Sequence, residues 1–279
     1  MNEPSFDVQI EVISKIRKKG GNTHMGRNLT KEELILHKDM ALQRLDTYMT
    51  SLIENSDPKI KSKSDKLSYW IEDWTTFLDF ESEFSPKSLR RYKRGEIIKA
   101  HLGYNIGSEE GGLHYCVVID KENSKNSPII TVIPLTSIKR KTDLEHLHKG
   151  NIYLGNEIFT NLNSKVLLVE KKCSDRIALV LKALNSTNKD IPKETLLFLQ
   201  HELDTARKEE KLIERIRKEI QKMKIGSIAL VPQIRTISKI RIYDPKTNFD
   251  ILSNVKLSNE KLDLIDREIL HNFTGVKNV

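Results

Sequence analysis

The spacing of apolar residues changes near residue 94, and this change indicates which secondary structure each part of the chain forms. Before this point apolar residues recur at three- and four-residue steps, the spacing of an amphipathic helix. After it, short apolar runs such as YCVVI at 115–119 and IITVIPL at 129–135 are typical of buried strands. A helical pattern returns over about 173–223. The sequence therefore predicts an α+β fold, with helices before, within and after a β-rich core.

The N-terminal region, residues 1–86, is predicted to be a helical module. Apolar residues over 6–16 indicate a first helix, which a pair of glycines ends. Thr30 and Glu33 form a capping-box pattern that opens a second helix. A third helix is expected to start at Ser64, with tryptophans and phenylalanines along one face.

A domain boundary is predicted at Pro86, because the basic segment that follows has little apolar pattern. Residues 87–279 are then a second domain, with a helical hairpin inserted at about 173–223 and a final amphipathic helix from Ser258. Further strands are expected at residues 96–102, 151–154, 165–169 and 227–231.

The charge balance and the cysteine content indicate which kind of partner and which cellular compartment to expect. It has 47 Lys and Arg against 39 Asp and Glu, a net charge of +8, which favours polyanionic partners or simply solubility. Cys116 and Cys173 have no CxxC spacing, so a disulfide framework is not expected and a reducing compartment is. No apolar stretch is long enough to span a membrane. We therefore expect a cytoplasmic protein.

Common catalytic motifs do not occur in the sequence. It has no phosphate-binding GxxxxGK[ST] loop, no GxGxxG, no HExxH and no GxSxG. His146 and His148 beside Glu145 form either a metal contact or a solvated loop, and no second ligand cluster accompanies them. No metal or other cofactor is expected.

Three stretches carry the strongest functional signal. The first, residues 93–119, starts with an Arg-Gly-Glu triplet and continues with the loop GSEEGG. The second is the strand end IPLTS at 133–137, which carries two hydroxyls, and the third, at 227–239, contains QIRTI. In this order they resemble the most recognisable blocks of the MazF/PemK toxin family. The resemblance covers roughly residues 93–155 and 226–272.

The resemblance implies a fold, an activity and partners. The fold is a small SH3-like β-barrel that works as a homodimer. The activity is endoribonuclease cleavage of single-stranded RNA without a metal, in which the 2′-hydroxyl attacks the phosphate. Family toxins belong to type II toxin-antitoxin systems, so a cognate antitoxin protein is the expected partner.

His114 and Thr136 are the candidate catalytic residues. His114 falls where the family has an arginine just after the glycine pair, and Thr136 falls on the family's hydroxyl position. A histidine transfers protons near neutral pH better than an arginine does, but it lacks the bidentate grip on phosphate. Alternatively, His114 only caps the start of its strand and Thr136 is an ordinary strand-end threonine.

Six residues are expected to bind RNA: Ser108, Glu109, Gly111, Gly112, Gln233 and Arg235. The alternative for the glycine-rich loop is a flexible hairpin, and Arg235 either meets phosphate or locks the loop by hydrogen bonds. Leu230 and Pro232 occupy the positions at which the PemK branch has an arginine and an aspartate. That branch's mechanism therefore cannot be transferred to this chain.

Two functional hypotheses follow. The first is an endoribonuclease toxin with additional helical segments. The second is a catalytically weak protein of the MazF fold that binds nucleic acid or a partner without cutting. Because His114 replaces the family arginine, the sequence leaves both open.

Overall fold

The computed structural model describes residues 29–139, 142–186, 192–224 and 226–275. The chain forms two compact units, residues 1–69 and 70–279. The helix expected over 6–16 lies outside the described residues. The domain boundary at Pro86 stays a prediction.

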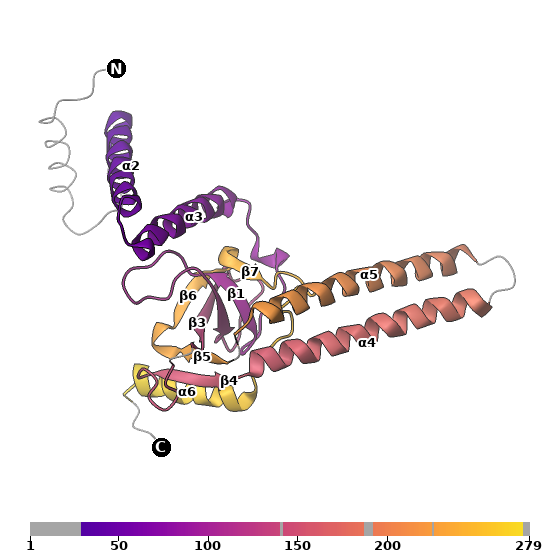
Figure 1. The fold of residues 1–279 in the computed structure, drawn as a ribbon. Helices are drawn as coiled ribbons and strands as arrows, with labels where there is room; N and C mark the ends of the chain where they lie inside the picture. Colours follow the sequence, from indigo (N-terminus) through magenta and orange to yellow (C-terminus); the bar gives the residue numbers. More distant parts are fainter. Residues whose placement is uncertain (1–28, 140–141, 187–191, 225, 276–279) are drawn as a thin grey trace, which may run out of the picture. The chain divides into compact units, whose positions relative to one another are not determined.

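Helices and strands alternate in blocks, as the change of period predicts (Figure 1). In chain order the described elements are α2 (Lys31–Ile53), α3 (Pro58–Glu81), η1 (Pro86–Ser88), β1 (Ile97–His101), β2 (Leu113–Val118), β3 (Ile129–Ser137), β4 (Asn151–Gly155), α4 (Glu157–Ser186), α5 (Lys193–Lys222), β5 (Ser227–Leu230), η2 (Val231–Gln233), β6 (Arg235–Ser238), η3 (Lys239–Arg241), β7 (Ile242–Asp244) and α6 (Asn259–Phe273).

The two N-terminal helices differ in how well the sequence predicts their starts. The capping box of α2 is confirmed, since the Thr30 hydroxyl accepts from the Glu33 amide and the Glu33 carboxylate accepts from the Thr30 amide. The start of α3 at Ser64 was wrong, because the helix begins at Pro58. A proline fits the first turn, where its missing N–H would have no helical partner. The Asp57 carboxylate accepts the amide of Lys59 there (2.8 Å).

The described strands form one antiparallel sheet of seven strands. The order is β4-β5-β3-β2-β1-β7, and β6 pairs with β3 beside this path. The α+β class is confirmed. Within the described residues no pairing joins β4 to β7, so the sheet path is open and closure into a barrel stays a prediction. The sequence pattern does not predict the short strands β6 and β7.

The central strands are buried on both faces, which explains their uninterrupted apolar runs. On one face Ile97, Val117 and Ile133 join an apolar cluster that includes residues of α4, α5 and α6. On the other face the alternate residues Ile98, Cys116 and Val132 join a cluster with Tyr92. Because side chains alternate along a strand, each run contributes to both clusters.

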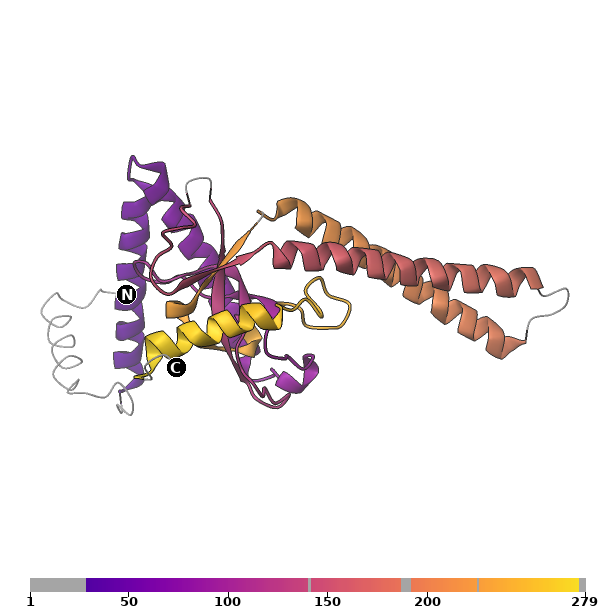
Figure 2. The same ribbon diagram turned by 90° about the horizontal axis from the view of Figure 1, so that it is seen from below.

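The inserted helices form an antiparallel hairpin in which α4 and α5 lie side by side (Figures 1 and 2). The strand expected at 165–169 was wrong, because these residues belong to α4, which begins at Glu157 rather than near 173. Seen alone, the apolar run resembles a buried strand. In the structure Ile158, Leu162, Val166 and Val169 follow the helical period, and all four are buried in the core.

The Arg-Gly-Glu triplet attaches α6 to the first strand. The Arg94 guanidinium binds the carboxylate of Asp266 in α6. Gly95 has φ +82°, and a Cβ there would lie 2.7 Å from Cδ1 of Leu262. The Glu96 carboxylate accepts from Arg90 (3.0 Å). The triplet therefore has a structural role in this chain.

Candidate functional site

The two candidate catalytic residues lie in one pocket of about 370 Å³. His114 comes from β2 and Thr136 from the end of β3, and these strands are neighbours in the sheet. The last turn of α5 and the start of β5 complete the walls. The lining residues are Lys99, Leu113, His114, Tyr115, Leu135, Thr136, Ser137, Glu219, Lys222, Met223, Lys224 and Ser227. The sequence interpretation that pairs His114 with Thr136 is thus consistent with their placement.

Both ring nitrogens of His114 face oxygen atoms. Nδ1 lies 3.3 Å from the carbonyl oxygen of Leu135, and Nε2 lies 3.1 Å from a carboxylate oxygen of Glu110. A carbonyl oxygen only accepts hydrogen bonds, so the Nδ1 nitrogen must carry a proton for this bond to form. The imidazolium form donates to both oxygens. Its orientation is therefore defined from two sides, as proton transfer requires.

Thr136 contributes a side-chain hydroxyl to the pocket. Its backbone pairs with Ile228 of β5, which holds the residue at the strand end, and its side chain is half-buried. Among the described residues its Oγ1 forms no hydrogen bond. A hydroxyl in this state can donate to an oxygen of a bound phosphate.

Sequence reasoning missed a third group in the pocket, Glu219 of α5. Its carboxylate accepts from the Lys99 ammonium (2.7 Å) and from the Tyr115 hydroxyl. Burial alone would raise the pKa of Glu219, but the hydrogen bonds from Lys99 and Tyr115 outweigh it and lower the pKa. Burial and the bond to Glu219 raise the pKa of Tyr115, which stays protonated. No local pattern points to Glu219, because it lies about a hundred residues from its partners.

The loop between β1 and β2 is fastened by the third sequence block. The Gln233 side chain accepts from the Glu110 amide (2.6 Å) and donates to the Ser108 carbonyl (3.2 Å). Arg235 donates to the Glu110 carbonyl (3.2 Å) and to the Gln233 side chain (3.2 Å). Of the two readings of Arg235, these contacts support the one in which it locks the loop. Glu110, which lies in the loop that the family resemblance places along the RNA groove, links this clamp to His114.

Four of the six residues expected to bind RNA gather at a second, more open hollow of about 560 Å³. Ser108 and Glu109 from the loop and Gln233 and Arg235 from the third block line it. The structure thus brings these four residues together, and Glu110 connects this hollow to the His114 pocket. Their binding to RNA stays a prediction.

The glycine pair closes the loop through its backbone. A Cβ on Gly111 would lie 2.7 Å from the carbonyl oxygen of Gly103, so the two chain segments approach closely only because Gly111 has no side chain. The amide of Gly112 donates to that same oxygen (2.7 Å), and its φ is +85°. These contacts account for both glycines locally, and a role in RNA binding stays a prediction for them.

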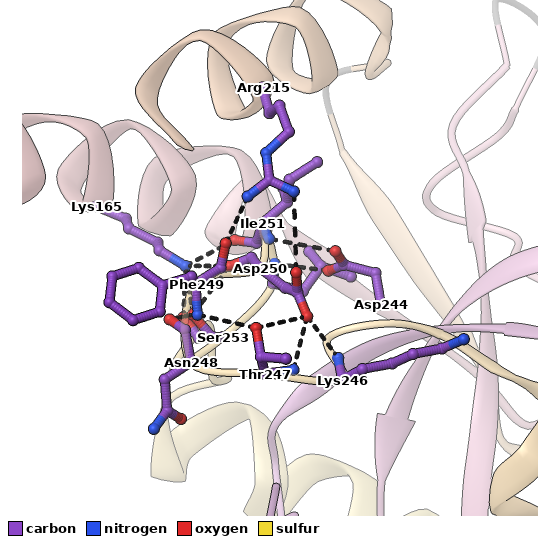
Figure 3. Close-up of polar contacts among 11 residues, drawn as sticks. Lys165, Arg215, Asp244, Lys246, Thr247, Asn248, Phe249, Asp250, Ile251 and Ser253 are labelled. Carbon is purple, nitrogen blue, oxygen red and sulfur yellow. Dashed lines mark hydrogen bonds and ion pairs between the residues drawn. The ribbon is translucent and has the colours of Figure 1, made fainter. Parts of the chain in front are cut away.

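A separate polar network lies where α4 meets residues 244–253, and Figure 3 shows it. The Lys165 ammonium donates to the carbonyls of Asp250, Ile251 and Ser253 and to the Ser253 hydroxyl, at 2.8–2.9 Å. Burial lowers the pKa of Lys165 to about 8. The Asp244 carboxylate accepts the amides of Ile251 and Leu252 in the same segment. The charged and polar groups of this network bind one another, which indicates that the network has a structural role.

Among the described residues, no three His, Cys, Asp or Glu side chains converge as a metal site would require. The Nδ1 of His146, one of the two histidines beside Glu145, lies 2.9 Å from Asp143. None of the described helices is both long and apolar enough to cross a membrane.

Comparison with known proteins agrees with the first two sequence blocks. Residues 93–171 match the family of PemK-like, MazF-like toxins of type II toxin-antitoxin systems. The match contains the first two blocks, with His114 and Thr136, and ends within α4, before the third block. No curated protein matches the chain. The suspected resemblance to the MazF/PemK toxins is confirmed over this stretch.

Proposed function

We propose that this chain, which carries the PemK-like and MazF-like toxin sequence over residues 93–171, is an endoribonuclease toxin that cleaves single-stranded RNA. The observation that carries the proposal is the pocket shared by His114 and Thr136. Neither residue is adjacent to the other in sequence, and both come from strands within the matched stretch.

The proposed reaction is an attack of the ribose 2′-oxygen on the adjacent phosphorus. A bond from the 2′-oxygen to phosphorus forms while the bond from phosphorus to the 5′-oxygen breaks. The 2′-hydroxyl loses a proton and the 5′-oxygen gains one, which leaves a cyclic phosphate and a 5′-hydroxyl. This chemistry needs proton transfer and hydrogen-bond donors but no metal.

The residues of the pocket fit these needs. His114 transfers a proton to or from the reacting oxygens, with its ring held between Leu135 and Glu110. Thr136 donates its hydroxyl to a phosphate oxygen, where negative charge develops in the transition state. Glu110 acts through His114 and is a positioning residue, in the way a carboxylate orients the base of a catalytic triad.

The RNA strand is proposed to pass from this pocket over the neighbouring hollow. There Ser108, Glu109 and the clamped loop shape the groove, with Gln233 and Arg235 behind it. The family setting adds the remaining parts of the proposal: a barrel-like toxin core, a homodimer, a cognate antitoxin and RNA of the cytoplasm as substrate.

The second candidate function is a binding protein that retains the site but cuts RNA poorly. The observation that favours it is His114 itself. This residue stands where the family has an arginine that would bind phosphate, and its Nε2 already contacts the carboxylate of Glu110. In that case the same surface would hold RNA or a partner without strand cleavage.

Incubation of the purified full chain with a mixed-sequence single-stranded RNA in EDTA separates the two functions. The toxin proposal predicts cleavage products with a 5′-hydroxyl, a loss of cleavage in His114→Ala and a strong reduction in Thr136→Ala. His148→Ala, an exposed histidine outside the pocket, is the matched control and should cut like the wild type. If the RNA is bound but stays intact, the binding function replaces the enzymatic one. Retained cleavage in His114→Ala would contradict the proposed mechanism.

A further inference from the structure

The end of the inserted helix α5 forms one wall of the His114 pocket. Glu219, Lys222 and Met223 lie at this end, and Lys224 follows it. α5 lies between β4 and β5 in sequence, beyond the stretch that matches the toxin family, which ends within α4. This chain therefore builds its pocket partly from residues that the matched sequence does not contain.

The position of this wall is fixed by the buried contact of Glu219 with β1 and β2. Lys99 and Glu219 are paired at 2.7 Å with side-chain exposures of 21% and 16%. Lys99 also lies over the ring of Tyr115, 5.1 Å from its centroid, and Tyr115 donates to Glu219. Because both strand residues hold the same carboxylate, the last turn of α5 cannot move away from the pocket without breaking a partly buried ion pair.

The charges on this wall suit a polyanion. Lys99, Lys222 and Lys224 line the pocket with one carboxylate, Glu219. Lys99 and Glu219 neutralise each other, so the two exposed lysines of the α5 end are left as the net charge. They lie at the pocket that also contains the proton-transfer group His114 and the hydroxyl of Thr136.

We propose that Lys222 and Lys224 supply the grip on the RNA phosphate that His114 lacks, with Glu219 positioning them through Lys99 and Tyr115. This inference rests on the proposed function. It assigns the substrate-phosphate contact to the hairpin insertion rather than to the strands. The ammonium groups act as point charges on the phosphate, and the histidine is then free to transfer protons.

The test compares two double variants that remove the same charge from the same segment of the chain. K222Q/K224Q removes the lysines at the pocket, and K208Q/K211Q removes two exposed lysines of α5 farther along the helix. The controls lie about 20 Å away, at 1.5 Å rise per residue. Because both variants lose the same charge, any general electrostatic attraction between the protein and RNA is the same in both. Thermal melting checks that each variant is folded.

Two readouts are measured for the wild type and both variants. The first is anisotropy of a labelled mixed-sequence oligonucleotide with 2′-O-methyl groups, which lacks the attacking hydroxyl and stays intact, over a series of salt concentrations. The second is cleavage of the ordinary RNA. K222Q/K224Q should bind at least about tenfold more weakly, since a charge-assisted hydrogen bond is worth that much. Its salt slope should be smaller than that of wild type by about 1.4, because each neutralised phosphate of a single strand contributes roughly 0.7.

The outcomes separate this inference from the proposed function. Weaker binding, a reduced salt slope and slower cleavage in K222Q/K224Q alone support the inference. If the wild type cleaves RNA and the two double variants show equal changes in binding, salt slope and cleavage, the inference is wrong and the proposed function survives. A wild type that neither binds nor cleaves the RNA overturns both. Binding without cleavage by the wild type, with the weakening confined to K222Q/K224Q, keeps the phosphate contact and removes the catalytic function.

Discussion

Nε2 of His114 lies 3.1 Å from a carboxylate oxygen of Glu110. The backbone amide of Glu110 is in turn held by Gln233, 2.6 Å away. One loop residue thus joins the candidate proton-transfer group to a sequence block more than a hundred residues later.

Glu110→Gln should slow RNA cleavage by roughly tenfold to a hundredfold with little effect on folding. The amide is nearly the same size but removes the charge that faces His114, and a hydrogen bond to a charged group is worth about 1.5–3 kcal/mol. Cleavage rates over a pH series are the measurement, because a positioning role changes the profile as well as the rate. Glu122→Gln, an exposed loop residue, is the control. An unchanged rate and profile in Glu110→Gln would remove Glu110 from the site.

Gln233→Ala should loosen the loop between β1 and β2. The substitution removes the acceptor for the Glu110 amide and the donor to the Ser108 carbonyl, and it leaves Arg235 with one partner fewer. We expect a decrease of about 1–2 kcal/mol in the free energy of unfolding. Faster proteolysis or hydrogen exchange within residues 103–112 should accompany it. If exchange in this loop stays at the wild-type rate, the clamp does not hold it.

Gly95→Ala should destabilise the protein by about 1–3 kcal/mol. The residue has φ +82°, and the added Cβ would meet Leu262 Cδ1 at 2.7 Å, so both backbone strain and a clash with α6 result. Urea denaturation measures the destabilisation. Gly275→Ala is the matched control, since its added Cβ meets no atom within 4 Å, and it should unfold at the wild-type midpoint. Equal midpoints for the two variants would contradict this account.

The stability of the fold should fall as the pH drops below the ordinary pKa of histidine, because of His101. Burial, with Arg241 nearby, lowers the pKa of His101, although Asp73 lies 3.2 Å from its Nε2 and opposes this. Between the lowered pKa and 6.5, the unfolded chain holds a proton that the folded chain does not. The free energy of unfolding therefore decreases as the pH falls through this window.

Urea midpoints at pH 7.5 and at pH 5 measure the His101 effect. His101→Leu should flatten the difference between the two values, because the titrating group is gone. Emission of Trp70, which stacks on His101 with ring centroids 4.8 Å apart, reports the local packing. His148→Gln should retain the wild-type pH dependence. A His101→Leu profile as steep as that of wild type would show that another group is responsible.

Lys165→Met should lower the free energy of unfolding by about 2–4 kcal/mol. The substitution keeps most of the apolar stem but leaves the carbonyls of Asp250, Ile251 and Ser253 without their donor. Denaturant unfolding measures the change, and RNA cleavage by the folded fraction should persist. Lys172→Met removes an exposed lysine near the same network and should be close to neutral. A neutral Lys165→Met would mean that water replaces the ammonium.

Local features were predictable because neighbouring residues determine them. The capping box at Thr30 and the cap of α6 at Ser258 involve groups three residues apart, and the apolar run around Cys116 is continuous in sequence. The error at 165–169 has the same origin. The four apolar residues at 166–169 fit a strand or a buried helix, and only the longer stripe from Ile158 to Val169 distinguishes the two.

The spacing of apolar residues predicted the α+β class, helices before, within and after the β-rich core, and strands β1 to β5 of the seven. The family resemblance pointed to His114 and Thr136 as candidate site residues. Which distant groups join these two residues followed from the tertiary structure alone. Gln233 binds the backbone of Glu110, whose carboxylate contacts His114. Glu219, Lys222 and Lys224 line the same pocket, and they come from the hairpin inserted between two strands of the sheet. These contacts join segments that are far apart in sequence, and the second set depends on where a long insertion packs against the core. Periodicity and spacing report only the separation of residues along the chain, so they carry no signal of that packing.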